Sequence, residues 1–385
     1  MNDLLALAQR LIAYDTSEPE AVLKTAGFVK GWLEARGIEA VQEYSKGLPV
    51  TMAEVGPAEG AAADGGSGAA SAAGAPGADG VPTVVLHGHI DVVPGREGQF
   101  EPRLEGDRLI GRGAYDMKGA LAAMMTCFAG LADQDRVRVR LAIVADEESE
   151  EEHERGSDHL VDAGFTGDFV ITGEPTDLHI GIEAKGVLAL RLEVPGRAAH
   201  GSTPWLGDNA VLKAIDVFRS IESLPFARES SELFDRPSIN LGRIWGGDAF
   251  NKVPDRCVID VDIRYLPDQD REAILAQIEE VAECRVLKTF VRPPAVVDAD
   301  SVYVRALSEA VAEHLDTKPT SVGRDGASDV VSFLRAGVPA VEFGPAGGGH
   351  HGPEEWVSIQ SLHRYRDSLD GFLKALPDRV GERDD

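Results

Sequence analysis

The spacing of apolar residues predicts helices near the start of the chain and strands further along it. In residues 4–14 and 20–37, apolar side chains recur every three or four positions, which is the period of an amphipathic helix. Residues 82–93 and 136–148 are strand-like apolar runs that end in polar residues, and residues 117–132 between them have the apolar content of a helix packed on a sheet. This alternation of strand and helix predicts an α/β domain whose sheet is flanked by helices.

The pattern of predicted strands and helices changes near residue 180 and returns to the earlier one near residue 292. In between, extended runs at 186–196, 238–247 and 257–267 are combined with helical patterns at 209–224 and 270–283. This combination favours an α+β unit with an antiparallel sheet. We therefore predict a discontinuous larger domain, residues 1–179 and 293–385, with a mixed, mostly parallel sheet. Residues 180–292 would be inserted into it as a smaller domain.

Residues 56–80 differ from the rest of the chain in composition. They consist almost wholly of Gly, Ala, Ser, Pro and acidic residues, which cannot bury enough apolar surface to become ordered. We predict a flexible surface insertion within the larger domain.

The charge of the chain argues against two classes of partner. The formal net charge of the 385 residues is −27, whereas nucleic acids and anionic membranes both require clustered cations. No export signal opens the chain, and no apolar stretch approaches the length of about 20 residues that a membrane span needs. We therefore expect a cytoplasmic protein. Cys127, Cys257 and Cys284 lack metal-binding spacing, which fits reduced structural thiols.

Side chains that can bind metal follow several of the predicted strands. Because ligands gather at the carboxyl ends of strands in open α/β sheets, we expect these residues to converge. They are His89 and Asp91 in HID, Asp116 in GRGAYDMKG, Glu147 and Glu148 in DEE, Glu174 in TGE, and His351 in GGGHHGPEEW. Imidazoles and carboxylates without a thiolate are a ligand set for zinc or for a mixed pair of transition metals.

Each of these motifs also has a structural interpretation when it is taken alone. A histidine at a strand end is commonly a hydrogen-bonded structural residue, residues 146–148 can form a surface cluster, and residues 111–119 can form a glycine-rich turn. Together and in this order, the motifs resemble those of the M20 family of metallopeptidases and deacylases. That family includes acetylornithine deacetylases, succinyl-diaminopimelate desuccinylases and glutamate-releasing carboxypeptidases. The resemblance covers nearly the whole chain apart from residues 56–80.

The resemblance implies a centre with two zinc ions, for which cobalt or manganese can substitute. It implies that His89 and Glu174 bind one ion, that Glu148 and His351 bind the other, and that Asp116 bridges the two. Asp91 is expected to orient His89, and Glu147 is expected to be the general base. His350 is the alternative to His351, but the spacing His-x-Pro-x-Glu, which ends at Glu355, favours His351.

Two further resemblances lie in the predicted inserted domain. Residues 196–210 are similar to a lid motif in which His200 reaches the active site of a partner subunit, so a homodimer is implied. Residues 246–265 are similar to a motif that places Asn251 and Arg264 beside a substrate carboxylate, which an arginine can bind with two hydrogen bonds. The alternatives are a buried polar His200 and an Arg264 in a structural ion pair.

One more candidate substrate contact lies near the C-terminus. The stretch DGASDVVSFL aligns with a family segment that often carries Thr where Ala327 stands. The corresponding hydrogen bond to substrate is therefore either absent or made by Ser328.

Taken together, the residues and the resemblance predict a dizinc amidohydrolase that removes the acyl group from an N-acyl amino acid. Two metal ions can hold a bridging water and lower its pKa, and Glu147 would take the proton and pass it to the leaving nitrogen. A metallo-dipeptidase or carboxypeptidase of the same family, acting on short peptides, is the first alternative, and a non-catalytic amino-acid-binding relative is the second. The other acids of this stretch, Asp146, Glu150, Glu151, Glu152 and Glu154, are expected to be solvated or structural.

Overall fold

The computed structural model describes residues 2–58, 80–148, 155–281, 283–315, 319–326 and 328–381. The chain divides into two compact units: the first comprises Met1–Ile182, Val297–Ser321 and Asp329–Asp385, and the second comprises Glu183–Val296 and Val322–Ser328. The predicted boundaries were at residues 180 and 292, and the assignment of 322–328 to the second unit was not predicted. Most of the predicted insertion at 56–80 lies outside the described residues.

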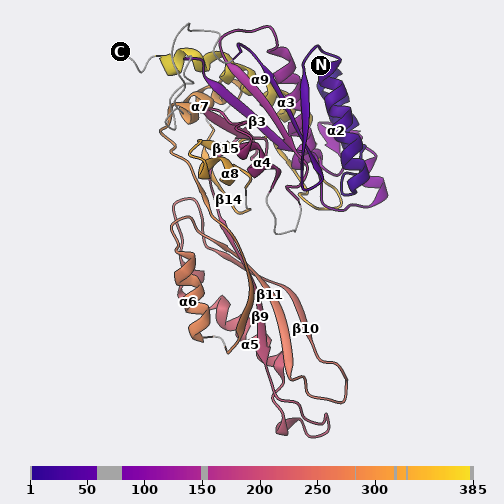
Figure 1. Ribbon diagram of the computed structural model, residues 1–385, viewed down its shortest axis with the longest axis vertical. Coiled ribbons are helices and arrows are strands. Elements are labelled where there is room, and N and C mark those ends of the chain that lie inside the picture. Colours follow the sequence, from indigo (N-terminus) through magenta and orange to yellow (C-terminus); the bar gives the residue numbers. More distant parts are fainter. Residues whose placement is uncertain are drawn as a thin grey trace. The chain divides into compact units, whose positions relative to one another are not determined.

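The largest sheet has parallel strands at its centre and antiparallel strands at both edges (Figure 1). Its order is β1 (Ala40–Ser45), β2 (Leu48–Val55), β6 (Arg138–Val144), β3 (Thr83–His89), β7 (Phe169–Thr172), β15 (Ala340–Glu342), β8 (Ile180–Ala184) and β13 (Ala295–Val296), with β14 (Ser321–Arg324) paired to β8. The neighbours β6, β3, β7 and β15 pair in parallel, whereas β1 with β2, β2 with β6, β15 with β8 and β8 with β13 pair antiparallel. Every residue of β3 is buried, as expected for a parallel strand covered on both faces. The predicted α/β class with a mixed sheet is confirmed, but the sheet is not mostly parallel, because its antiparallel edge strands extend on both sides of the four parallel ones.

Helices pack on this sheet in two groups. In one group α1 (Asn2–Ile12) contacts α3 (Gly119–Gly130), α3 contacts α9 (Ile359–Gly381), and α9 contacts α7 (Val302–His314). In the other group α4 (Gly156–Asp162) packs on α8 (Val330–Arg335). A further helix, α2 (Pro19–Glu34), lies on β1 and β2. The predicted helices near the N-terminus and at 117–132 correspond to α1, α2 and α3, whereas α4 and α9 were not predicted.

A small antiparallel sheet joins two distant segments of the first unit. Its order is β16 (Gly347–Gly348), β17 (Trp356–Ser358), β5 (Arg108–Ile110) and β4 (Arg103–Glu105), and the short helix η1 (Glu97–Phe100) precedes β4. The pairing of β17 with β5 places Trp356 opposite Ile110. Backbone hydrogen bonds therefore hold the segment that carries His351 beside the segment that leads to Asp116.

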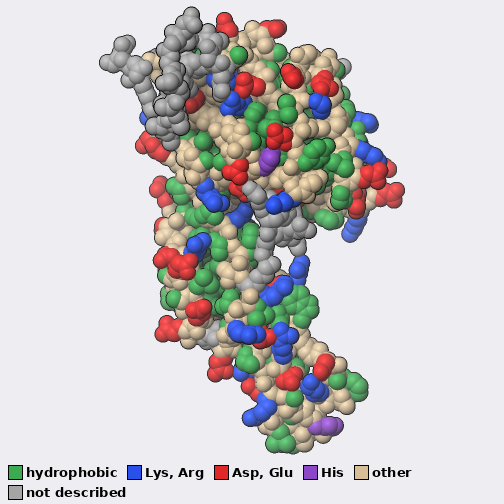
Figure 2. All heavy atoms as spheres, in the orientation of Figure 1, with side chains coloured by type: hydrophobic (Ala, Val, Ile, Leu, Met, Phe, Trp, Pro, Cys, Tyr) green, Lys and Arg blue, Asp and Glu red, His purple; other side chains and the backbone are tan. Residues whose placement is uncertain are grey.

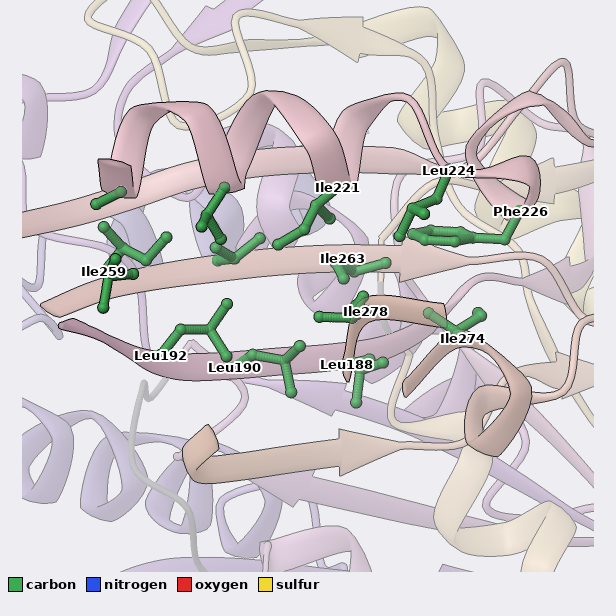
Figure 3. Close-up of a cluster of buried hydrophobic side chains, with 14 of the residues drawn as sticks. Leu188, Leu190, Leu192, Ile221, Leu224, Phe226, Ile259, Ile263, Ile274 and Ile278 are labelled. Carbon is green, nitrogen blue, oxygen red and sulfur yellow. The ribbon is translucent and has the colours of Figure 1, made fainter. Parts of the chain in front are cut away.

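The second unit has the predicted α+β composition. Its antiparallel sheet has the order β10 (Ser238–Gly246), β11 (Arg256–Tyr265), β9 (Gly186–Pro195) and β12 (Arg285–Arg292), accompanied by α5 (Ala210–Glu222), α6 (Arg271–Val281), η3 (Pro204–Leu206) and η4 (Pro225–Arg228). Figure 3 shows leucines of β9 and isoleucines of β11 facing Ile221 of α5 and Ile278 of α6. Burying each such side chain contributes about 1.5–3 kcal/mol. The unit therefore has a hydrophobic core of its own.

Charged side chains of both signs are visible on the face shown in Figure 2, where acidic and basic residues are interspersed. No helix in the described part of the chain combines the length and the apolar composition needed to span a bilayer.

The three cysteines are free thiols, and Cys127 and Cys257 are buried, as predicted for structural residues.

Candidate metal centre

The carboxyl ends of the central parallel strands carry the acids and the histidine that were predicted to converge. β3 ends at His89, β6 is followed by Glu147 and Glu148, and β7 is followed by Glu174. Since β6, β3 and β7 are parallel neighbours, these ends lie at one edge of the sheet. Asp116 comes from the helical turn η2 (Ala114–Lys118), directly before α3.

A first cluster consists of His89, Asp116 and Glu174. His89 Nε2 lies 3.1 Å from Asp116 Oδ1 and 3.5 Å from Glu174 Oε1. Burial disfavours a charged His89, but the neighbouring acids raise its pKa well above the usual range. Burial, together with the charge of Asp116, raises the pKa of Glu174 to about 7. Glu174 Oε1 is buried without a hydrogen-bond partner among the described residues, so it is available to a cation.

A second cluster consists of Asp116, Glu148, His350 and His351. His351 Nε2 lies 3.1 Å from Glu148 Oε1 and 3.3 Å from Asp116 Oδ2. His350 Nε2 lies 2.5 Å from the same Asp116 Oδ2. The contacts with Asp116 and Glu148 raise the pKa of His351 to about 10. The two imidazoles are about half exposed, at 46% and 47%, so this cluster opens to solvent whereas the first does not.

Asp116 belongs to both clusters. Its Oδ1 contacts His89, and its Oδ2 contacts His350 and His351. Although burial favours the neutral acid, hydrogen bonds from these histidines hold the pKa of Asp116 well below its usual range. Donor atoms of His89, Asp116 and Glu174 all lie within 4.8 Å of one another, as do those of Asp116, His350 and His351. Imidazole nitrogens and carboxylate oxygens gathered this closely fit two divalent transition-metal ions.

Asp91 contacts both His89 and the turn that follows β6. His89 Nδ1 lies 3.0 Å from the backbone carbonyl oxygen of Asp91 and 3.5 Å from its carboxylate Oδ1. The other carboxylate oxygen accepts a hydrogen bond from the backbone N–H of Glu148 at 2.8 Å. A partner on Nδ1 fixes the orientation of the ring and leaves Nε2 directed to the cluster. The nearest partner of Nδ1 is thus the carbonyl of Asp91 rather than its carboxylate.

The Glu147 carboxyl lies among other acids, although part of the residue remains exposed. Burial raises the pKa of its carboxyl well above the usual range, and the charges of Asp329 and Glu174 add to this rise. The guanidinium of Arg155 donates to the backbone carbonyls of both Asp146 and Glu147. The turn is therefore fixed through its backbone, and the carboxyl of Glu147 stays beside the first cluster.

Ser157, His87 and Asp329 form a buried polar network in the first unit. Ser157 Oγ donates to Asp329 Oδ2 at 2.6 Å and lies 3.1 Å from His87 Nε2, while His87 Nδ1 lies 3.2 Å from Thr172 Oγ1. Burial lowers the pKa of His87 to about 4. A serine, a histidine and an aspartate can form a nucleophilic triad, but Ser157 is fully buried and cannot meet a substrate. The network therefore joins α4, β3 and β7 to the start of α8.

An ion pair that was not predicted holds both segments of the second cluster. Arg112 Nη1 donates to Glu355 Oε2 at 2.6 Å, and both side chains are almost wholly buried. Glu355 Oε1 accepts hydrogen bonds from the backbone N–H groups of Tyr115 at 3.0 Å and Asp116 at 3.1 Å. Arg112 Nη2 donates to the carbonyl oxygen of His351 at 3.0 Å. The only sequence signals were an arginine between two glycines and the last residue of His-x-Pro-x-Glu.

We expect Glu355→Gln to destabilise the protein and to weaken metal binding at the second cluster. The substitution removes the counter-charge of a buried guanidinium, and breaking a buried pair in this way costs about 3–5 kcal/mol. Urea unfolding of the metal-free protein and competition with a chelator for added divalent metal measure the two effects. The matched control is Glu354→Gln, because the Glu354 side chain is 75% exposed and pairs with Arg103 at 3.3 Å. The control should lose less than about 1 kcal/mol, and equal losses in both variants would refute the role of the buried pair.

The residues predicted for lid and substrate contacts lie in the second unit. His200 is exposed, and its Nδ1 lies 2.7 Å from Ser202 Oγ, so the alternative of a buried histidine is wrong. Arg264 Nε donates to Asp262 Oδ1 and Oδ2 at 3.1 Å and 3.0 Å, which is the structural ion pair that was the alternative for this residue. The two side chains of this pair remain about one-third exposed, at 30% and 34%. Asn251 is exposed.

Ser328 and Asp146 are both buried. The carboxylate of Asp146 accepts hydrogen bonds from the backbone N–H of Gly156 at 2.9 Å and 3.0 Å, so this acid is structural. The predicted hydrogen bond from Ser328 to substrate stays a prediction. The acids Glu150, Glu151, Glu152 and Glu154, together with Ala327, lie outside the described residues.

Comparisons with known sequences agree on one family. A model of the family described as Peptidase family M20/M25/M40 matches residues 85–375. A succinyl-diaminopimelate desuccinylase from Sphingopyxis alaskensis is 32% identical over 312 residues, which cover 74% of this chain and 79% of the relative. A LysW-lysine/LysW-ornithine hydrolase from Saccharolobus solfataricus is 27% identical over 287 residues, which cover 73% of this chain and 77% of the relative.

Solved structures share the fold over almost the whole chain. An M20 family metallo-carboxypeptidase from Sulfolobus solfataricus matches with a TM-score of 0.78 and 21% identity, covering 98% of this chain and 100% of that one. The aminopeptidase PepT from Bacillus cereus matches with a TM-score of 0.74 and 18% identity, and the match covers 97% of this chain and 98% of PepT. At these identities the likeness concerns the fold alone.

Proposed function

The chain belongs to peptidase family M20/M25/M40 and is a hydrolase that acts on amides, and from this premise we propose that it is a dizinc enzyme that deacylates N-acyl amino acids. The observation that carries the proposal is the position of Asp116, whose two carboxylate oxygens contact two separate clusters of ligand residues. A carboxylate shared in this way suits a centre of two ions.

The ligands would divide between the two ions as the clusters do. His89 and Glu174 would hold one zinc ion, and Glu148 and His351 would hold the other. Asp116 would be a ligand of both ions. Cobalt or manganese could replace zinc in these sites. When bound, the ions polarise the amide carbonyl and lower the pKa of water from about 15.7 towards about 7. The unpartnered Oε1 of Glu174 supports this assignment, because a buried oxygen without a donor is costly unless it meets a cation.

Glu147 would be the general base. It would accept the proton of the attacking water and deliver it to the nitrogen of the leaving amine. Two observations support a division of labour between Glu147 and Glu148. The Glu148 carboxylate contacts His351, whereas the Glu147 carboxyl interacts with Glu174 in the first cluster. Asp91 and Arg155 hold the backbone between these two acids.

The substrate class rests on the relatives and on the second unit. The Sphingopyxis alaskensis relative is named as a desuccinylase, which is an enzyme that removes an acyl group from an amino acid. Arg264 and Asn251 would bind the carboxylate of the amino acid, and the one-third exposure of Arg264 leaves its guanidinium open to a second partner besides Asp262. His200 would stabilise the oxyanion.

A homodimer is part of the proposal, with His200 acting on the centre of the partner subunit. Strand β10 is an edge of its sheet, and it exposes Ile244 and Trp245 at 41% and 47%. On the neighbouring helix α5, Leu212 and Ile215 are exposed at 60% and 40%. An edge strand beside exposed apolar residues is suited to pairing with a second copy of itself. Sedimentation equilibrium gives the mass directly, and a monomer at working concentration would refute this part.

A hydrolysis screen tests the substrate class. The zinc-loaded protein is assayed against N-succinyl and N-acetyl amino acids and against simple dipeptides, with chelator-treated protein as the control. We expect the acyl amino acids to give kcat/KM values of at least about 10⁴ M⁻¹s⁻¹ and the dipeptides to give much lower values. Faster cleavage of dipeptides would establish the peptidase alternative. A protein that binds two zinc ions and cleaves none of these compounds would indicate the non-catalytic relative.

A further inference from the structure

His350 is a second imidazole at the more exposed of the two clusters. Its Nε2 lies 2.5 Å from Asp116 Oδ2, the same oxygen that His351 Nε2 approaches to 3.3 Å. The donor atoms of Asp116, His350 and His351 form one group within 4.8 Å. The two histidine rings are 4.3 Å apart between centroids and are inclined at 70°, so they converge on this oxygen without stacking.

The backbone around His350 explains how two adjacent side chains reach one point. In an extended strand, consecutive side chains point to opposite faces. Here Gly349 has φ +73° and His351 has φ +56°, so the chain turns sharply on both sides of His350. A left-handed conformation is unfavourable at a non-glycine residue such as His351. It is held by the hydrogen bond from Arg112 to the His351 carbonyl.

The ring of His350 is also supported from the side. The ring of Tyr115 lies edge-on to it, with centroids 6.1 Å apart and planes at 86°. The Tyr115 hydroxyl donates to Asp177 Oδ1 at 2.8 Å, and the same oxygen accepts the backbone N–H of Gly347 at 3.3 Å. Tyr115 is therefore tied to the segment that leads into His350. This arrangement limits the freedom of an imidazole that would otherwise move in solvent.

We propose that His350 and His351 both bind the second metal ion, together with Asp116 and Glu148. This inference rests on the proposed two-ion centre and extends it. The second site would then have two imidazole nitrogens, whereas the first has only His89 alongside Asp116 and Glu174. Imidazole favours zinc and cobalt, and carboxylate is the better ligand for manganese. The two sites therefore differ in metal preference, and the second is the more selective for zinc over manganese.

Stepwise metal binding to the whole protein tests this inference. Zinc and, separately, manganese are titrated against a competing chromophoric chelator, for the wild type, for His350→Ala and for the control His159→Ala. His159 pairs with Glu43 at 2.7 Å in the first unit. We expect His350→Ala to weaken one zinc step by about 10- to 100-fold or more, to leave the other step unchanged, and to affect manganese less. The control should keep both zinc steps.

Further measurements distinguish an error in the assignment of His350 from an error in the proposed two-ion centre. The melting temperature of the zinc-free protein should not change in His350→Ala, because the side chain is half exposed. The visible absorption of the cobalt-loaded protein should change in His350→Ala, since a ligand is lost. If the wild type binds two zinc ions and His350→Ala binds both equally well, the inference about His350 is wrong and the two-ion centre stands. If the wild type itself binds no zinc, the proposed function fails first.

Discussion

Glu147→Gln is expected to lower kcat by about 10²- to 10⁴-fold while both metal ions remain bound. Glutamine keeps the size of the side chain and one acceptor oxygen, but it cannot take up a proton. The proposed ligands are left in place, because it is the neighbouring Glu148 that contacts His351. Steady-state hydrolysis and the zinc content of the same sample give the two quantities.

Glu105→Gln is the control for this substitution. Glu105 is exposed on β4 and pairs only loosely with Arg103, at 3.7 Å, so its replacement should leave both kcat and zinc content near the wild-type values. A Glu147→Gln enzyme with two zinc ions and a wild-type kcat would remove Glu147 from the mechanism. Loss of zinc together with activity would instead make Glu147 a ligand.

Asp116→Ala should have the largest effect on metal content. Because the two oxygens of Asp116 contact different clusters, alanine removes a ligand from both sites at once. We expect the zinc content to fall from about two ions per chain to less than one, with a loss of activity of several kcal/mol in transition-state stabilisation. Elemental analysis after dialysis, followed by the hydrolysis assay, measures both effects.

Glu174→Gln provides the internal comparison for Asp116→Ala. Glu174 contacts only the first cluster, through His89, so its replacement should weaken one zinc ion and leave the other in place. A zinc content near one would then distinguish it from Asp116→Ala. If both variants lost zinc to the same extent, Asp116 would not be the shared ligand that its geometry indicates.

The elements with strong periodicity were predictable, and those defined by long-range pairing were not. Residues 82–93 and 136–148 stood out because fully buried parallel strands are continuous apolar runs. Helix α9, the longest described helix, was not predicted, although its buried Leu362, Tyr365, Leu369, Phe372 and Leu376 recur every three or four positions. Residues 322–328 belong to the second unit, where Asp325 pairs with Lys185 at 2.6 Å, and no local pattern reveals this long-range contact.

The residues of the candidate site were also predictable where a local motif marked them and not where a long-range contact defines them. Motifs at strand ends pointed to His89, Glu148 and Glu174, since a sheet edge brings the ends of parallel strands together, and the glycine-rich motif GRGAYDMKG pointed to Asp116. The partnership of Arg112 with Glu355 joins residues 243 positions apart, and neither residue has a pattern that indicates the other. The spacing His-x-Pro-x-Glu favoured His351 over His350, whereas in the structure both imidazoles contact Asp116. The positive φ at His351 is what lets both reach Asp116.

The first unit is interrupted in the sequence by the second, so its later segments are synthesised only after most of the second unit. His89, Asp116, Glu148 and Glu174 all precede the second unit, whereas His350 and His351 follow it. Strand β15, which fills the position between β7 and β8, also follows it. Because domains fold as units during synthesis, the second unit can complete its four-stranded sheet while the first still lacks a central strand. In the proposed assignment, a nascent or truncated chain that stops before His350 therefore has an incomplete second site, and retention of both zinc ions marks a chain that extends past His351.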